Sequence, residues 1–473
     1  SGIGMGSLMN DVKQIEVFKG PQSAVFGPNS MAGLINISSN DPTPYISGDA
    51  SISMDNDNGH LLSGSYSKPL SKHIFLRASL VKHYSDGFRT NNYFNVSNTN
   101  KKDETLLRVK LFINPINRLK IKLTTYRIDI NNGFDIWTPD NNGFITYSDY
   151  KGVDSQITNA FAIRSNYITP ILGVPSNFLS ISTFSRNDLK YSYDGDWGNL
   201  DFWEENNQWY EASLDYPELG FPDDYYPYKF EDETIRNRQT TTQEMRIARG
   251  SEVLGVYYSN VIESDDRNGW LFGGRADSLH SKFTINTLAW YFATKFSIFN
   301  KIRLGFNFRI ESNTIKNTFS ASLYGIDKPG FEDETSDILF GNRIELDYKP
   351  HQKILYSISL SRGYKTSGIN QSPNIGIIEN LGAELRKYKS EYVYNAEGGV
   401  KFEEESTNLS LSIFYMHRDN PQVRLSYQLD PTDPTSFDYY TVNAHSGYAY
   451  GIESQLKLAV SDRLYFYDNI SIL

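Results

Sequence analysis

The stretch Ile302-Arg-Leu-Gly-Phe-Asn-Phe-Arg-Ile310 alternates apolar with mostly polar residues along its whole length. Successive side chains of a β-strand point to opposite faces, so one face of this segment is apolar and the other carries the arginines and the asparagine. The same alternation returns in Leu119–Thr124, Ile354–Ser361 and Leu409–Ile413. We therefore predict an all-β chain whose strands lie between hydrocarbon and water, although strands of a soluble β-sandwich alternate as well.

Connectors of two unlike lengths separate about 17 candidate strands, which run from Tyr45 to Leu473. Short and long connectors take turns, as in an up-and-down barrel with two different rims. In bacterial outer membranes the short turns face the periplasm and the long loops face outside. The predicted short turns are Pro69–Ser71, Asn114–Arg118, Thr169–Pro175, Gly250–Ser251, Asn300–Lys301, Lys349–Gln352, Glu403–Ser406 and Ser461–Asp462. The predicted long loops are Ser85–Asp103, Asn131–Asp154, Asp188–Gln239, Glu263–Leu279, Lys316–Asp337, Gly363–Lys389 and Asp419–Asp438.

The difference between the two rims favours a transmembrane antiparallel β-barrel over the soluble sandwich. Single-chain bacterial barrels close with an even number of strands, so an odd count predicts that the sheet is truncated before its last strands. The first residues, Ser1–Gly6, have neither the basic nor the apolar region of a secretion signal. If the protein is exported, we expect that its signal has been removed or was never part of this sequence.

Composition narrows the class of protein. Apolar residues make up only 39% of the 473 residues, and no window approaches the roughly 20 apolar residues of a membrane helix. Aromatic residues reach 14%, and Tyr and Trp favour the lipid–water interface. The net charge of -10 argues against a nucleic-acid partner, which requires a basic patch. The sequence has no cysteine, which excludes disulfides and thiolate chemistry.

A compact segment precedes the first barrel strand. It reads Val12-Lys-Gln-Ile-Glu-Val-Phe-Lys-Gly-Pro-Gln-Ser-Ala-Val-Phe-Gly27 and is followed by Gly33-Leu-Ile-Asn-Ile37. The pattern predicts a strand, a Gly-Pro turn, one helical turn and a second strand. The glycines allow left-handed turns or close backbone approach. On these features alone, the segment would fit many small α/β pieces.

The order of these residues closely resembles the C-terminal half of the plug domain of TonB-dependent outer-membrane receptors. The match rests on Ile15, Glu16, Val17, Lys19, Gly20, Pro21, Gln22, Gly27, Gly33 and Asn36. Three later segments also resemble the family pattern, namely Gln243–Ile247, Ser361–Asn370 and Tyr450–Glu453. Two positions depart from it, because Lys19 stands where Arg is more common and Phe26 where Tyr is common. These departures put bidentate or hydroxyl contacts from the two positions in doubt.

The resemblance implies a 22-stranded barrel around a plug. Residues 1–44 would then be the C-terminal part of the plug, and residues 45–473 would be the barrel, truncated before its last strands. It also implies a monomer in the outer membrane of a Gram-negative bacterium, in contact with lipid and lipopolysaccharide. Import of a scarce solute, most simply a ferric siderophore, would be driven by the TonB–ExbB–ExbD complex through an N-terminal segment outside this sequence. Cobalamin or an oligosaccharide as the ligand, and a passive porin, remain alternatives.

Candidate binding residues concentrate in Asp188–Gln239, which holds 14 acidic and 4 basic residues interleaved with aromatic rings. Rings and carboxylates together suit an aromatic or sugar-like ligand, while a solvated loop lying against lipopolysaccharide is the alternative. The predicted ligand-binding residues are Tyr191, Tyr193, Trp197, Trp203, Trp209, Tyr364 and Asn370. The oxygen-rich stretch Asp194, Asp196, Asn199 and Asp201 suggests a Ca²⁺ site, although its spacing departs from the EF-hand pattern.

Two further expectations concern the plug and catalysis. Glu16 and Lys19 are candidates for ion pairs between plug and wall, facing inward positions that include Arg303 and Arg309. The seven histidines have no metal-ligand spacing, and the sequence has no nucleophile motif or phosphate-binding loop. We therefore predict a protein that is not an enzyme and needs no cofactor, with any iron carried inside its ligand.

Overall fold

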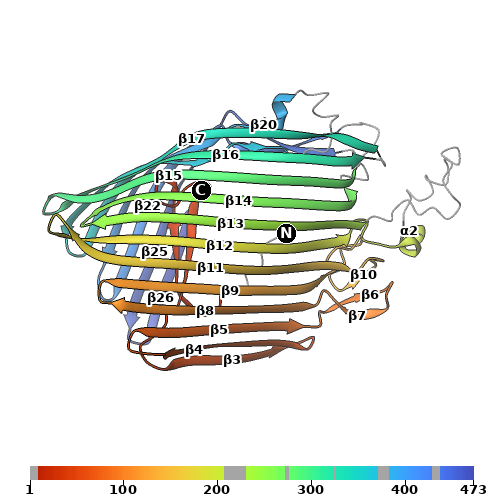
Figure 1. Cartoon of the computed structure of the whole chain (residues 1–473), viewed down its shortest axis with the longest axis horizontal. Helices are drawn as coiled ribbons and strands as arrows, with labels where there is room; N and C mark the ends of the chain where they lie inside the picture. The colour runs from red at the N-terminus through yellow and green to blue at the C-terminus, as the bar shows by residue number, and fades with distance from the viewer. Residues whose placement is uncertain (1–8, 207–230, 272–275, 324–325, 371–382, 429–436) are drawn as a thin grey trace.

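The structure is a computed structural model that describes residues 9–206, 231–271, 276–323, 326–370, 383–428 and 437–473 (Figure 1). Within these residues, seventeen long strands form one antiparallel sheet that curls into a barrel. The predicted fold class and strand count are confirmed. The strands are β3 (Ser47–Asp55), β4 (Gly59–Pro69), β5 (Ile74–Ser85), β8 (Lys102–Ile116), β9 (Leu119–Phe134), β11 (Gly152–Ile171), β12 (Val174–Asp194), β13 (Glu231–Arg249), β14 (Glu252–Leu271), β15 (Ala276–Phe299), β16 (Ile302–Leu323), β17 (Ile326–His351), β18 (Ile354–Lys365), β21 (Glu391–Glu403), β22 (Thr407–Asp419), β25 (Ser446–Ser461) and β26 (Leu464–Ile472).

The order of the sheet follows the chain, and it places β26 next to β3. Each strand pairs antiparallel with the next barrel strand, for example β17 with β18 through Arg343 and Ser361. Since the direction reverses at every step and the strand number is odd, β3 and β26 run the same way. The neighbours β3 and β26 are therefore parallel, whereas all the other neighbouring strands of the barrel are antiparallel.

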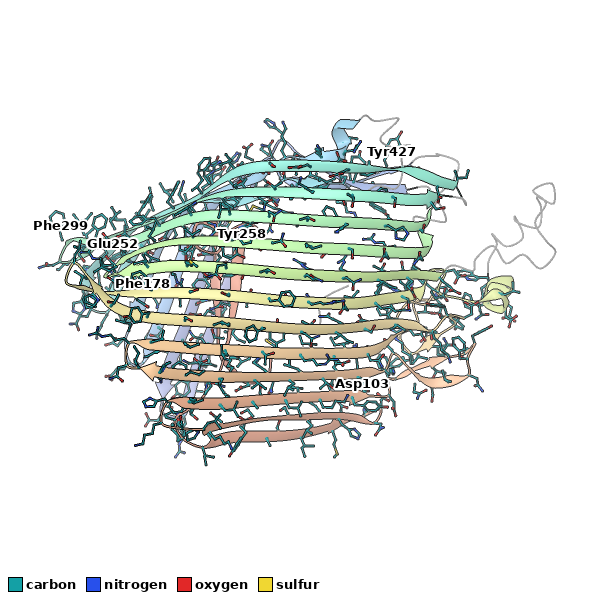
Figure 2. The ribbon with its side chains drawn as sticks, in the orientation of Figure 1. Asp103, Phe178, Glu252, Tyr258, Phe299 and Tyr427 are labelled. Carbon is teal, nitrogen blue, oxygen red and sulfur yellow. The ribbon has the colours of Figure 1, made fainter. Side chains whose placement is uncertain are left out.

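Burial in the barrel is the reverse of that in a soluble sandwich. On β18, Ile358 and Leu360 are 60% and 57% exposed, whereas Ser359 and Ser361 between them are only 4% and 5% exposed. The apolar side chains point out of the barrel and the polar ones point into it. Figure 2 shows side chains of this kind along both faces of the ribbons. Only a hydrocarbon surround makes the exposed apolar face favourable, which excludes the soluble sandwich.

One rim of the barrel has the predicted short turns, whereas at the other rim two of the predicted long loops are largely strand. Short turns join the strands at the rim near Glu252 and Phe299, on the left of Figure 2. At the opposite rim the predictions of long loops at Glu263–Leu279 and Lys316–Asp337 are wrong, because β14 to β17 continue as strands through most of both segments. Polar side chains on both faces look like loop sequence, yet above the membrane a strand can be wet on both sides.

Short elements decorate this outer rim. They are β6 (Arg89–Asn91), β7 (Val96–Thr99), β10 (Ile145–Thr146), α2 (Leu200–Asn206), β19 (Gly368–Ile369), η3 (Ala383–Arg386), β20 (Lys387–Tyr388), β23 (Gln422–Gln428) and β24 (Phe437–Asn443). Several of them pair with each other, as β23 does with β24. Among the described residues, no helix has the length and apolar character needed to cross a membrane.

The predicted plug segment lies inside the barrel. It folds as the hairpin of β1 (Val12–Lys19) and β2 (Gly33–Ser39), with the single helical turn α1 (Ser23–Phe26) in the connection. Gly27, at the end of α1, has a backbone φ of 85°. Residues other than glycine rarely adopt this conformation. The strand, turn, helix and strand order predicted from sequence is confirmed. The domain boundary after residue 44 stays a prediction, and it falls between β2 and β3.

Candidate functional site

The helical turn α1 packs directly against the inner wall of β16, β17 and β18. The Tyr364 N–H donates to Ser23 Oγ at 3.1 Å, and the Asn29 N–H donates to the Tyr364 carbonyl oxygen at 3.1 Å. Ser23 and Tyr364 are fully buried. A β-carbon at Gly341 would lie 3.0 Å from Ala24 N, so only glycine lets the two backbones approach this closely. We call this dry contact the α1 seam: Ser23 and Ala24 against Gly341, Gly363 and Tyr364.

A buried polar cluster supports the α1 seam from the wall side. Arg309 donates two hydrogen bonds to Glu311 Oε2, at 2.9 and 2.7 Å, and the Tyr364 hydroxyl donates to the same oxygen at 3.2 Å. The Arg309 guanidinium also lies 5.4 Å from the ring centre of Tyr257. A β-carbon at Gly27 would be only 3.1 Å from Arg309 Nη2. The wall thus holds a charged pair in a dry place, and the plug glycine leaves room for it.

The other contacts of the plug are mainly ion pairs and hydrogen bonds to charged side chains, and only some of them are exposed to water. Lys19 pairs with Glu453 on β25, and the Lys19 side chain is 48% exposed. Lys122 on β9 donates to both oxygens of Asp41, at 2.7 and 2.6 Å. A less exposed pair joins Asp11 to Arg77 on β5 at 2.6 and 2.8 Å. Most of the charge that holds the plug therefore lies away from the α1 seam.

The structure corrects part of the predicted pairing between plug and wall. Lys19 does reach the wall, but Glu16 accepts a hydrogen bond from Asn36 Nδ2 at 2.8 Å within the plug. Arg309 is bound to Glu311, and Arg303 donates to Asp347 at 3.3 Å. The wall arginines already have acidic partners on the wall itself. Sequence alone could not reveal this, because the partner of each charge depends on register between strands.

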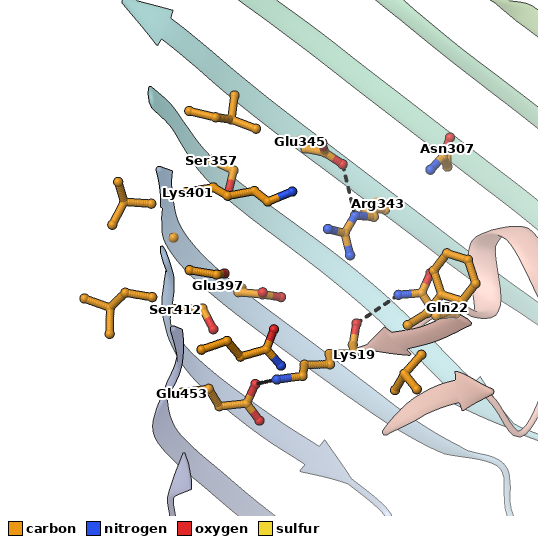
Figure 3. A pocket seen from close by; sticks show the side chains of 18 residues that line it. Lys19, Gln22, Asn307, Arg343, Glu345, Ser357, Glu397, Lys401, Ser412 and Glu453 are labelled. Carbon is orange, nitrogen blue, oxygen red and sulfur yellow. Dashed lines mark hydrogen bonds and ion pairs between the residues drawn. The ribbon is translucent and has the colours of Figure 1, made fainter. Parts of the chain in front are cut away.

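A polar cavity of about 820 Å³ separates the hairpin from the wall on the Lys19 flank (Figure 3). Wall strands β16, β17, β18, β21, β22 and β25 contribute its lining, and Lys19 and Gln22 enter it from the plug (Figure 3). Its charges balance, with three cationic and three acidic side chains. They are Lys19, Arg343, Lys401, Glu345, Glu397 and Glu453. Such a space suits water and polar solutes rather than an apolar ligand.

A second cavity, of about 310 Å³, lies above the plug, where Asn29 contributes to its lining. Arg238, Lys365 and Tyr388 supply donors, and Glu263 supplies one carboxylate. Part of the remaining wall is apolar and is formed by Val261, Phe283, Ile285, Ile315 and Ile369. Thr366, Ser367 and Gln422 add polar groups to it. A face of hydrocarbon beside a few donors is typical of a site for a small organic ligand.

Sequence reasoning missed this upper cavity. Arg238 and Glu263 fell within predicted loops, whereas the structure places them on β13 and β14. Their alternation was a usable signal, because Arg236, Arg238 and Thr240 share one face of β13. Lys365 directly follows Tyr364, which was predicted to bind the ligand, but Lys365 itself was not predicted.

The predicted ligand-binding residues fall into separate places. Tyr191 and Tyr193 lie on β12 beside Phe134, with ring centres of Tyr191 and Phe134 4.8 Å apart. Trp197 stacks on Trp137 at 5.7 Å in the segment before α2. Trp203 lies on α2. Trp209 lies outside the described residues.

The two remaining predicted residues are engaged by the protein. Tyr364 is buried in the α1 seam, and Asn370 Nδ2 donates to the carbonyl oxygens of Leu385 and Thr441 at 2.7 and 2.8 Å. Neither of the two cavities described above is lined by any of the predicted ligand residues. Ligand contact by this set stays a prediction.

The four residues of the suggested Ca²⁺ site are not equivalent. Asp194, Asp196 and Asn199 are buried, whereas Asp201 is exposed in the first turn of α2. Burial, together with the neighbouring Asp196, raises the pKa of Asp194 well above its usual range. Within the described part of the chain, no group of three or more His, Cys, Asp or Glu side chains is arranged to hold a metal ion. Calcium binding stays a prediction.

A barrel with an apolar outer face, a polar lumen and a hairpin plug inside defines an outer-membrane receptor rather than an open pore. In agreement, residues 124–471 match the family described as TonB dependent receptor-like, beta-barrel. The chain belongs to this family, whose members are outer-membrane transporters of Gram-negative bacteria and not enzymes. The family assignment excludes the passive porin.

Similar proteins agree with this assignment. The chain is 21% identical over 422 residues to the pesticin receptor of Yersinia pestis, a match that covers 88% of this chain and 57% of that protein. The crystal structure of the ferric yersiniabactin uptake receptor FyuA from Yersinia pestis superposes with a TM-score of 0.77 at 17% identity, covering 98% of this chain and 66% of that one. The siderophore receptor PiuA from Acinetobacter baumannii gives 0.67 at 14% identity, covering 97% and 69%.

A third similar structure is named for a different transported solute, copper. The copper transporter OprC gives a TM-score of 0.70 at 12% identity, covering 97% of this chain and 66% of that one. At these identities the structural likeness establishes the fold alone. The present chain spans 57% of the length of the pesticin receptors.

Proposed function

We propose that the full-length protein imports a metal chelate across the outer membrane, most simply a ferric siderophore, using force supplied by the TonB–ExbB–ExbD complex. The ligand would enter from outside and bind in the upper cavity. The observation that carries the proposal is the position of that cavity, which has plug residue Asn29 in its lining. A ligand there touches wall and plug together, so its presence can be sensed by the element that must later move.

The chemistry of the upper cavity supports a chelate with an apolar body. Val261, Phe283 and Ile285 offer hydrocarbon contact, while Arg238 and Lys365 offer donors to the oxygen atoms of a ligand. Among the described residues of the lining, Glu263 is the one carboxylate beside the two cations, which leaves a small excess of positive charge. Several similar structures bear the names of siderophore receptors, which favours iron, and one is named a copper transporter.

Growth assays test the ligand. An iron-starved strain that lacks the receptor would be supplied with ferric siderophores, cobalamin or oligosaccharides, with and without the full-length gene. We expect growth to be restored by at least one ferric siderophore. Restoration by cobalamin or an oligosaccharide alone would replace iron by that ligand.

A pair of variants tests the site. Arg238→Ala should weaken ligand binding by about 1.5–3 kcal/mol, the range for a lost hydrogen bond to a charged group. Lys316→Ala is the matched control, because Lys316 is half-exposed and pairs with Glu334 outside the cavity. Direct binding to the purified receptor, measured by calorimetry, separates the two. Equal affinities for both variants would place the ligand elsewhere.

A further inference from the structure

Two of the contacts that hold the plug, the α1 seam and the Lys19 flank, are unlike, and their difference has a mechanical consequence. On one flank, the α1 seam excludes water: Ser23 and Tyr364 are fully buried and Ala24 is 5% exposed. Hydrogen bonds there have no water to replace them while the contact opens, so each carries a desolvation penalty. The buried Arg309–Glu311 pair lies directly behind the seam.

The flank next to the seam is wet, because a cavity separates it from the wall. The 820 Å³ space lies between the hairpin and β17, β18, β21, β22 and β25, and its plug side is formed by Val17, Phe18, Lys19 and Gln22 (Figure 3). Among the described residues, one ion pair crosses it, between Lys19 and Glu453. A half-exposed pair of this kind contributes little to holding the plug, because water solvates both charges when the pair separates.

We propose that α1 stays bound to β16–β18 while the receptor works, and that the imported solute passes through the polar cavity on the Lys19 flank. Separation of Lys19 from Glu453 opens the path, and the α1 seam acts as the fixed attachment. The balanced charges of the cavity let a solute of either sign pass without a deep binding site. The inference rests on the proposed function for its transport step, but its route can be tested without any ligand.

The first experiment uses leakage instead of uptake. The sequence contains no cysteine, so an introduced one is a unique target within it. Ser412 lines the cavity from β22 (Figure 3). In the full-length receptor we would combine Lys19→Ala, which removes the ion pair, with Ser412→Cys. A small uncharged methanethiosulfonate reagent would then attach a benzyl group to residue 412.

The matched control is Ser63→Cys in the same Lys19→Ala background. Ser63 lies on β4, on the lumen side of the barrel away from the cavity, where its hydroxyl contacts Ser51. We expect Lys19→Ala to leak a small chromogenic solute, the label at 412 to suppress the leak, and the label at 63 to leave it. Leakage that is absent in Lys19→Ala, or unaffected by the label at 412, overturns the route.

The second experiment locks the α1 seam. A β-carbon at Gly363 would lie 3.2 Å from Ser23 Oγ, close to the spacing of about 3 Å between a sulfur and its partner's β-carbon in a disulfide. Ser23→Cys with Gly363→Cys should therefore form a disulfide on oxidation. We expect energy-dependent uptake of the ligand found in the growth assay to be the same in the oxidised and reduced forms of this variant.

A fall in uptake of at least roughly tenfold on oxidation, restored by reductant, would show that α1 must leave the wall and would overturn the inference. The reduced form serves as its own folding control. If the variant does not fold, the leakage experiment still decides the route. Failure of the proposed function is distinguishable, because the wild-type receptor would then take up no ligand while the leakage results would stand.

Discussion

The α1 seam and the Lys19 flank hold the same plug by opposite means. The seam has few charges facing the plug and almost no exposed surface, whereas the flank has many charges and a cavity. Counting ion pairs would rank the flank as the stronger attachment. Solvation reverses that order, because an exposed ion pair exchanges its partner for water at little cost while a buried polar contact cannot. The comparison teaches that burial sets which side of the plug is fixed.

The largest expected effect is on the cluster behind the seam. Glu311→Ala leaves the Arg309 guanidinium buried and uncompensated, so we expect it to lower the free energy of unfolding by about 3–5 kcal/mol. Thermal unfolding of the full-length receptor in detergent measures this loss. Glu345→Ala is the matched control, since Glu345 is 29% exposed and shares Lys295 with Asp347. Equal losses for both variants would remove the distinction between the flanks.

The next effect concerns close packing. Gly341→Ala would place a methyl group 3.0 Å from both Ala24 N and the Tyr364 ring, which should cost about 1–3 kcal/mol of stability. Gly305→Ala on the neighbouring strand is the control, because its β-carbon would meet nothing closer than 3.6 Å. The difference between the two melting temperatures measures the tightness of the seam. A larger loss for Gly305→Ala would mean that the backbones do not approach as described.

A variant on the Lys19 flank should change the stability less, but it should change a functional property, the leakage of small solutes. Lys19→Ala should raise leakage of small solutes while changing the free energy of unfolding by less than about 1 kcal/mol. Lys13→Ala on the same strand is the control, because Lys13 forms no ion pair with a described residue. Leakage is measured with a chromogenic substrate of a periplasmic enzyme. If the two variants leak equally, the Lys19–Glu453 pair does not close the cavity.

The smallest effect is a pH response at the outer rim, far from both flanks. Burial raises the pKa of Asp232 to about 6, although the Tyr193 hydroxyl and Arg267 both lower it. In an unfolded chain the pKa of Asp is about 3.9. Folded Asp232 therefore binds the proton more tightly, and the outer rim gains stability as the pH falls from 7 through 6. The gain in stability is complete once the pH is below the pKa of Asp in the unfolded chain.

Hydrogen exchange of the outer ends of β12 and β13, corrected for the intrinsic pH dependence, would measure this gain. We expect slower exchange at pH 5 than at pH 7 in the wild-type receptor. Asp232→Asn removes the titrating group and should make the two pH values equal. Persistence of the full pH response in that variant would assign it to another group.

Local patterns predicted the fold well because they report on local surroundings. The alternation at Ile302–Ile310 gave a strand with one lipid face, and the Gly-Pro turn after Lys19 gave the hairpin with its helical turn. The same reasoning ended strands too early at Glu263 and Lys316, since a strand that is wet on both faces has no period of two. Five of the seven predicted ligand residues lie in the aromatic segment Asp188–Gln239, and none of the seven lines the cavity beside Lys19 or the upper cavity.

The sequence by itself determined a two-faced sheet, turns of unlike length at its two ends and the presence of a plug hairpin. These features follow from the period of the side chains, the lengths of the turns and a motif within about 25 residues. Only the tertiary structure decided that α1 is held in a dry seam, that Lys19 meets Glu453, and that Asn29 shares a cavity with Arg238. Those contacts join residues hundreds of positions apart, and the register of the sheet and the exclusion of water select them.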